Sequence, residues 1–225
     1  MEREVDVRLA RALLAGEPEA FERFVEHFRS KIFHHSMLVC GNPADAEEVA
    51  QETLLKVLES FHQLRDPERV RAWVFRIARN CCLLQARKSV FAPQHEVGLD
   101  ELPPTSDVAD SSSLPDQQVQ TGELRALLDH VISELPESYR SVVLLRDLEE
   151  LSTEETDQIL EVSPDAVKTR LHRARSAMRQ KLDCYLNSHC FDVEPVASPP
   201  PMSECAWDDL RTTWRAVTGV TAGRS

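Results

Sequence analysis

The sequence predicts an all-α protein built from two small helical domains that a flexible acidic linker joins. Apolar residues recur three or four positions apart, as in Phe21, Phe24 and Phe28, and this is the spacing of one helix face. No segment shows the alternating pattern of a half-buried strand. Residues 91–122 are rich in Pro, Ser, Asp and Gln, with six acidic and no basic side chains, a composition that cannot form a core.

The first predicted domain covers residues 1–90 and carries 14 basic and 14 acidic side chains. Its helical pattern is interrupted at residues 41–43 (Gly-Asn-Pro) and 65–67 (Arg-Asp-Pro), where proline stops helix propagation. Three or four helices fit between these turns.

The second predicted domain covers residues 123–186, after the linker. Its helical periodicity is broken at residues 135–136, 151–152 and 163–164, where Pro or Ser stands. These breaks predict four helices.

The remaining residues, 187–225, form a predicted C-terminal extension. It contains three consecutive prolines and then a short amphipathic stretch in which Trp207, Leu210, Trp214 and Val217 share one face. We expect this face to dock on one of the two domains or to bind a regulator.

Bulk composition restricts the class of protein. No segment reads as a signal peptide, and the apolar runs are far shorter than the roughly 20 residues of a membrane span, so a cytoplasmic protein without a membrane span is expected. The six cysteines lack the pattern of a secreted disulfide framework and are expected to be reduced. The sequence has only six glycines, no phosphate-binding loop and no nucleophile motif, which argues against an enzyme.

The strongest motif lies between residues 151 and 182, where two helices follow each other across a tight turn. Ser152 is placed to cap the first helix, and Ser163 followed by Pro164 opens the second. The second helix carries an apolar stripe, and its other positions are largely cationic. The candidate DNA-contacting residues there are Lys168, Thr169, Arg170, His172, Arg173 and Arg175.

This pattern is typical of a helix-turn-helix whose second helix enters the major groove of duplex DNA. From residue 165 to 181 there are six basic side chains and one acidic, although the net charge of the whole chain is −12. The alternative is that the basic face is solvated or pairs with the acidic segment 147–161, which holds seven acids and no base.

Three segments of this domain, residues 135–140, 151–163 and 167–175, resemble region 4 of the extracytoplasmic-function (ECF) sigma factors. The resemblance implies binding of the upstream promoter element as duplex. Glu150 and Glu161 stand where this family usually has glycine, and a side chain at positive φ costs roughly 1 kcal/mol.

The first domain has an acidic helix face, because Asp45, Glu48 and Glu52 are spaced three and four positions apart. By itself such a pattern is typical of a solvated surface. Residues 45–53 are similar, however, to the region 2 segment with which these sigma factors grip a coiled coil of the largest polymerase subunit. The resemblance implies that the three carboxylates bind core RNA polymerase.

Residues 71–80 and the loop 62–68 resemble the part of region 2 that holds the non-template strand of the opened downstream promoter element. Opened DNA requires cations for its phosphates and hydrogen-bonding groups for its bases. Trp73 shares a helix face with Ile77 and is expected to be core rather than a stacking platform. The resemblance assigns downstream DNA binding to Gln63, Arg65, Arg76, Arg79, Asn80, Arg87 and Lys88.

The C-terminal extension holds a candidate metal site made of Cys184, His189, Cys190 and Cys205. Three thiols and an imidazole suit zinc or copper. The alternative is a set of scattered reduced cysteines. The extension resembles the cysteine-rich tails with which some ECF sigma factors sense metal.

The sequence therefore predicts an ECF sigma factor that requires no cofactor and has core RNA polymerase and promoter DNA as partners. An anti-sigma factor or a self-inhibiting tail is a further candidate regulator. The competing function is a helix-turn-helix regulator that acts without polymerase, which would need neither the acidic face nor the downstream strip.

Overall fold

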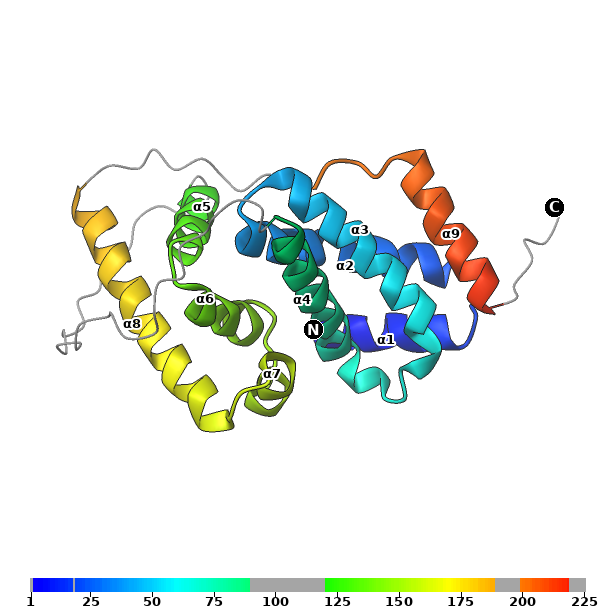
Figure 1. The fold of residues 1–225 in the computed structure, drawn as a ribbon, viewed down its shortest axis with the longest axis horizontal. Coiled ribbons are helices and arrows are strands. Elements are labelled where there is room, and N and C mark those ends of the chain that lie inside the picture. Colours follow the sequence, from blue (N-terminus) through cyan, green and yellow to red (C-terminus); the bar gives the residue numbers. More distant parts are fainter. Residues whose placement is uncertain (1, 18, 90–119, 189–198, 219–225) are drawn as a thin grey trace.

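The computed structural model describes residues 2–17, 19–89, 120–188 and 199–218, and every regular element in these ranges is helical (Figure 1). The all-α prediction is confirmed. Within these ranges no helix is long and apolar enough to cross a bilayer. The elements of the first bundle are α1 (Glu2–Leu14), α2 (Ala20–Cys40), α3 (Pro43–Ser60), the short 3-10 turns η1 (Phe61–Gln63) and η2 (Pro67–Arg69), and α4 (Val70–Ser89).

The turn between α2 and α3 forms as the Gly-Asn-Pro sequence predicts. Gly41 adopts a left-handed conformation with φ of 78°, and its N–H donates to the carbonyl of Met37 at 2.9 Å. Asn42 then caps α3, because its side-chain oxygen accepts a hydrogen bond from the backbone N–H of Asp45 at 2.8 Å. Pro43 is the first residue of α3, where its missing N–H costs nothing.

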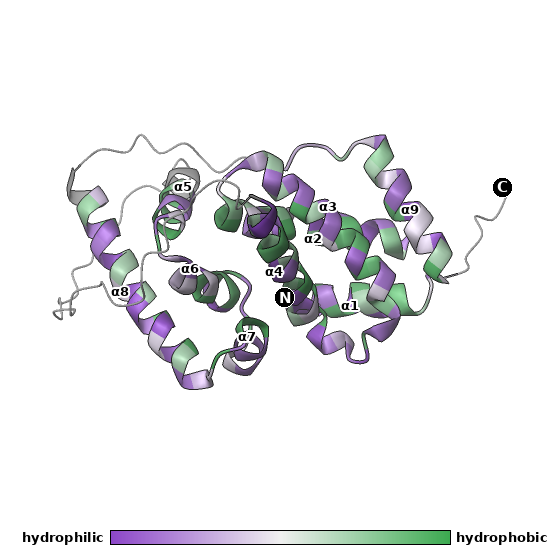
Figure 2. Ribbon diagram, in the orientation of Figure 1, coloured by the Kyte–Doolittle hydropathy of each residue, from purple (hydrophilic) through white to green (hydrophobic). Residues whose placement is uncertain are grey.

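Aromatic side chains fill the interior of the first bundle. Phe24, Phe28 and Phe75 are fully buried, and the rings of Phe24 and Phe28 lie 4.6 Å apart. Trp73 is half-buried and packs against this core, with its ring centroid 6.3 Å from that of Phe61. Figure 2 shows the hydrophobic residues gathered where α1 to α4 face one another.

The second bundle contains four helices joined by short turns. Gln120–Gly122, which the sequence assigned to the linker, already form the first turn of α5, and residues 91–119 lie outside the described residues. The elements are α5 (Gln120–Ser133), α6 (Glu137–Val143), the π-helical turn η3 (Leu144–Leu148), α7 (Thr153–Leu160) and α8 (Pro164–Ser188).

The two bundles pack against each other and share one continuous apolar core. Helices α2 and α4 contact α5, α6 and α7, so that these three helices separate α8 from the first bundle (Figure 1). Polar contacts reinforce this interface: Arg140 donates to the carbonyl of Leu38 at 3.0 Å, and His34 Nε2 lies 3.1 Å from a carboxylate oxygen of Asp129.

Helix α9 (Glu204–Thr218) returns to the first bundle and packs along α3 (Figure 1). Leu210 is buried, and the ring of Trp214 stacks on Phe21 with 5.7 Å between centroids. Trp207 approaches the same phenylalanine edge-on at 6.5 Å. Trp207, Leu210 and Trp214 of the predicted amphipathic face therefore dock on the first bundle, whereas Val217, predicted on the same face, stays exposed.

Candidate functional site

Helices α7 and α8 form the predicted helix-turn-helix, and both predicted caps are present. Ser152 and Glu155 make a capping box: the serine hydroxyl accepts from the backbone N–H of Glu155 at 3.1 Å, and the glutamate carboxylate accepts from the N–H of Ser152 at 2.8 Å. Ser163 accepts from the N–H of Ala166 at 3.2 Å and so opens α8.

The turn between these helices uses a strained residue. Glu161 has φ of 56° and Glu150, before α7, has φ of 53°, both in the left-handed region that favours glycine. The chain thus keeps the backbone that glycine usually supplies, and each glutamate adds a conformational cost of roughly 1 kcal/mol. The turn geometry is therefore retained in spite of the substitution.

Val167, Leu171 and Ala174 form the buried face of helix α8, so the cationic residues on its other face point outward. Lys168, Thr169, His172 and Arg173 are exposed and Arg170 is half-buried.

Arg175 alone among the predicted DNA-contacting residues pairs with the acidic segment, because its Nε donates to Asp147 at 3.0 Å. This hydrogen bond raises the pKa of the guanidinium. Lys168 has only a loose contact of 3.6 Å with exposed Asp165. Most of the face is therefore available to an anionic partner.

The acidic residues of α3 lie beside the end of α4. Gln85 donates from its amide to Asp45 at 2.7 Å and to Glu48 at 3.1 Å, and Lys88 also contacts Glu48 at 3.1 Å. The hydrogen bond from Asn42 lowers the pKa of the Asp45 carboxyl, which favours the charged form.

The side chains of Glu48 and Glu52 remain 56% and 50% exposed. They border a groove of about 350 Å³ between α3 and α4. The sequence did not predict that Gln85 orients these carboxylates, since 37 to 40 positions separate them along the chain.

The predicted downstream strip follows the outer side of α4 and the loop before it. Gln63, Arg65, Arg76, Asn80 and Arg87 are exposed, and Arg79 is half-buried. Among the described residues none of these side chains is engaged in an ion pair. Lys88 differs from them, because its contact with Glu48 places it at the acidic face.

Comparisons with known proteins agree with this arrangement. The family model for sigma-70 region 2 matches residues 24–90, and the model for sigma-70 region 4 matches residues 125–178. The ECF RNA polymerase sigma factor SigW of Bacillus subtilis is 30% identical over 170 residues, which cover 74% of this chain and 91% of SigW. The chain belongs to the ECF sigma factors.

Two solved sigma factor structures share the fold. A structure of CnrH in complex with the cytosolic domain of CnrY has a TM-score of 0.51 at 24% identity and covers 80% of this chain and 97% of CnrH. RpoE from Bartonella quintana, in complex with the anti-sigma factor NepR, has a TM-score of 0.53 at 19% identity and covers 73% of this chain and 98% of RpoE.

Family membership decides between the two functions considered from the sequence. An ECF sigma factor is a transcription initiation factor that binds core RNA polymerase and promoter DNA and is not an enzyme. A regulator that acts without polymerase is therefore not the function of this chain.

Arg71 is a central residue of this sigma factor that sequence reasoning missed. Its side chain is 2% exposed, its Nε donates to Asp6 of α1 at 2.5 Å, and another guanidinium nitrogen donates to the carbonyl of Glu149 at 3.1 Å. His27 also contacts Asp6 at 2.5 Å. Arg71 thus joins α1, α4 and the second bundle at one buried point.

The charged groups around Arg71 have shifted pKa values. Burial opposes ionisation of Asp6, but the hydrogen bonds from His27 and Arg71 outweigh it and lower the pKa of that carboxyl. Glu149 is 4% exposed and accepts no such bonds on its carboxylate, and burial raises its pKa to about 8. Glu149 is therefore largely protonated at neutral pH.

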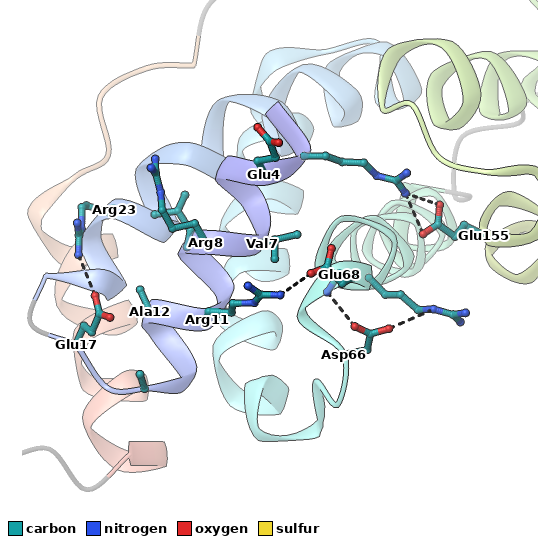
Figure 3. Close-up of a pocket in the computed structure, with 14 residues that line it drawn as sticks. Glu4, Val7, Arg8, Arg11, Ala12, Glu17, Arg23, Asp66, Glu68 and Glu155 are labelled. Atoms are coloured by element: carbon teal, nitrogen blue, oxygen red, sulfur yellow. Dashed lines mark hydrogen bonds and ion pairs between the residues drawn. The ribbon is translucent and has the colours of Figure 1, made fainter. Parts of the chain in front are cut away.

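A groove of about 1100 Å³ lies between α1, η2 and α7 and is drawn in Figure 3. Its charges pair within the groove. Arg11 contacts Glu68 at 2.7 Å, and Arg3 of α1 contacts Glu155 of α7 at 2.9 Å. Because Glu68 lies in the loop predicted to hold the downstream element, the first pair connects that loop with α1, and the second connects α1 with region 4.

The two predicted metal ligands that the structure describes, Cys184 and Cys205, do not lie together. Cys184 is exposed on α8 and Cys205 is exposed on α9, and these helices lie at opposite ends of the molecule in Figure 1. His189 and Cys190 lie outside the described residues. Within those residues no cluster of three or more His, Cys, Asp or Glu side chains is arranged to hold a metal ion.

Proposed function

We propose a division of labour within this sigma factor. Residues 1–90 bind core polymerase and the opened downstream element, and residues 123–186 bind the upstream element as duplex. Residues 91–122 connect them, and residues 187–225 regulate the factor. The supporting observation is that the acidic face of α3 and the basic face of α8 are both exposed and lie on different bundles. We place this activity in the cytoplasm.

Binding of core polymerase is proposed for Asp45, Glu48 and Glu52. The support is their geometry: Gln85 and Lys88 fix the first two carboxylates on one side of α3, and their side chains stay open to solvent. Ordered carboxylates on a rigid helix favour fast and specific association with a basic partner.

Upstream binding is proposed for the exposed face of α8, with Arg173 and His172 as its centre. Both are exposed, and among the described residues neither is engaged in an ion pair. Arg175 would have to exchange Asp147 for a DNA phosphate, so its contribution is smaller. The remaining members of this set are Lys168, Thr169 and Arg170.

Downstream binding is proposed for the outer side of α4 and the preceding loop. The supporting feature is a line of cations and amides in which, among the described residues, only Lys88 is engaged in an ion pair, and single-stranded DNA requires such groups. The residues are Gln63, Arg65, Arg76, Arg79, Asn80, Arg87 and Lys88.

For the tail we propose self-inhibition through α9. This helix covers apolar surface of α2 and α3, including Phe21 and Phe61, next to the helix that carries the acidic face. A partner that captures α9, or an anti-sigma factor that competes for the same surface, would then control the factor. The variant Leu210→Asp should release α9 and increase polymerase binding; unchanged binding would argue for a purely structural helix.

Zinc or copper regulation of the tail is a second proposal, which the cysteines support by their chemistry. Because Cys184 and Cys205 lie at opposite ends of the molecule, one metal ion can take both only after α9 leaves α3. Metal binding and docking of α9 would therefore exclude each other. A variant with Cys184, Cys190 and Cys205 changed to Ser that kept the metal response of the wild type would exclude this proposal.

The deciding experiment is run-off transcription with purified core polymerase, with and without zinc or copper. We expect initiation that depends on the factor and co-elution of the factor with core enzyme. If the pure protein neither associates with core polymerase nor supports initiation from any promoter, the proposed division of labour is wrong.

A further inference from the structure

Three cysteines gather at one end of the first bundle, away from the predicted metal ligands. Cys40 is the last residue of α2, and Cys81 and Cys82 are adjacent on α4. They pack into one small apolar cluster with Val49 of α3, separate from the main core. Cys82 is 4% exposed, whereas Cys40 is half-buried and reachable from solvent.

The two thiols at the α2–α4 contact are chemically unequal. A hydrogen bond from Cys82 lowers the pKa of Cys40, while the same contact and burial raise the pKa of Cys82. The sulfur of Cys82 also lies 4.0 Å from the hydroxyl oxygen of Ser36. An accessible thiol that ionises more readily beside a buried thiol that stays protonated is the arrangement of an attacking and a resolving cysteine.

Cys81 is directed elsewhere, which makes the pairing specific. The ammonium group of Lys56 lies 3.7 Å from its sulfur, on the side of the α3–α4 groove. Cys81 therefore faces Lys56 of α3, whereas its neighbour Cys82 lies beside Ser36 of α2. The contact that lowers the pKa of the Cys40 thiol comes from Cys82.

We propose that Cys40 and Cys82 form a redox-active dithiol that hydroperoxides convert into a disulfide between α2 and α4. The Cys40 thiolate attacks one oxygen of the hydroperoxide, the O–O bond breaks, and an alcohol, or water from hydrogen peroxide, leaves. Cys40 is then a sulfenic acid. The Cys82 sulfur attacks it, the S–S bond forms, the S–O bond breaks and water leaves. The two thiols supply the two electrons that reduce the peroxide.

The disulfide would act on the acidic face of α3. Cys40 is followed by Gly41 and by Asn42, which caps α3 and contacts Asp45. Gln85, one turn after Cys82, holds Asp45 and Glu48. Drawing the end of α2 onto α4 changes this turn, and we expect oxidation to weaken polymerase binding. This last step rests on the proposed role of the acidic face.

The test uses the full-length protein, treated with hydrogen peroxide, alkylated and digested without reduction. Mass spectrometry should find the peptides of Cys40 and Cys82 joined, with loss of two hydrogen atoms, and dithiothreitol should reverse the linkage. Because Cys81 and Cys82 share a peptide, the linkage should persist in Cys81→Ser and disappear in Cys82→Ala. The exposed-thiol variant Cys205→Ser is the matched control and should retain it.

Three outcomes would overturn the proposal: no linkage in the wild type, linkage of Cys40 to Cys81, or loss of linkage in Cys205→Ser. Circular dichroism of each variant shows whether it is folded, and Cys40→Ser, at a half-buried position, gives a second variant that should lack the linkage. Mass mapping requires no polymerase, so it stands or fails independently of the proposed function. Core binding of oxidised against dithiothreitol-treated protein then measures the consequence for the acidic face.

Discussion

Replacing Arg71 with Met should destabilise the protein far more than any exposed ion pair can. The substitution keeps an apolar stem but removes the charge that faces Asp6, whose side chain is 1% exposed. Removing one partner of a buried pair costs about 3 to 5 kcal/mol. His27 at 2.5 Å and Lys31 at 3.6 Å remain beside Asp6, so we expect the lower end, about 3 kcal/mol.

The matched control is Arg11→Met, the same chemical change at an exposed pair. Arg11 contacts Glu68 at 2.7 Å, but the two side chains are 65% and 62% exposed, so its loss should cost less than about 1 kcal/mol. Urea unfolding followed by circular dichroism measures both changes. In a chain of this size about 3 kcal/mol corresponds to a fall in Tm of roughly 6 to 12 °C.

Adding Asp6→Asn to Arg71→Met tests the cause. If the cost comes from an uncompensated buried carboxylate, the double variant should be more stable than Arg71→Met alone. Equal unfolding midpoints for Arg71→Met and Arg11→Met, or no recovery in the double variant, would refute the reasoning.

Three other predictions concern the charged groups. Between about pH 4.5 and 8 the folded state retains the Glu149 proton that the unfolded state loses. Glu149 therefore lowers the free energy of unfolding by up to about 1.4 kcal/mol for each pH unit of increase in this range. Urea unfolding of Glu149→Gln at several pH values should lack this dependence. Arg173→Ala should weaken upstream DNA binding and reduce the slope of log K against log salt concentration by about 1. Fluorescence anisotropy at several salt concentrations measures this slope, and an unchanged slope would contradict a phosphate contact. Glu48→Lys should weaken co-elution with core polymerase, and equal co-elution would contradict its assigned role.

Local signals predicted the helices and the turn chemistry of this protein well. Ser152 and Ser163 cap helices where the sequence places them, and the Gly-Asn-Pro turn ends α2 as expected. These features depend on residues within four positions of each other, so a single sequence contains the whole physical cause. The apolar spacing likewise fixes which face of α8 is buried.

The interface between the bundles could not be predicted in this way. Arg71 lies within a segment that also supplies exposed arginines, and Glu149 lies within a run of acids typical of a solvated surface. Their burial follows from a contact between residues 78 positions apart. The acidic segment 147–161 forms ion pairs with two different helices: Asp147 pairs with Arg175 of α8, and Glu155 pairs with Arg3 of α1. Composition alone cannot distinguish these partners.

The closed packing of the two bundles has a specific consequence for initiation. Helices α5, α6 and α7 lie between α8 and the first bundle (Figure 1). His172 and Arg173 on α8 and Glu48 and Glu52 on α3 stay exposed in this arrangement. The contact between the bundles therefore leaves the acidic face of α3 and the basic face of α8 accessible. It fixes only the distance between these two proposed binding faces. If the acidic face binds polymerase as proposed, it can do so before the bundles separate.

Separation of the bundles would then break the contacts of Arg71 with Glu149 and of Arg3 with Glu155. It would also expose the Glu149 carboxyl, whose pKa of about 8 exists only while it is buried. Once exposed, that carboxyl loses its proton at neutral pH, and the charge opposes its return to the apolar interface. Opening should therefore release a proton, and a higher pH should favour the open form.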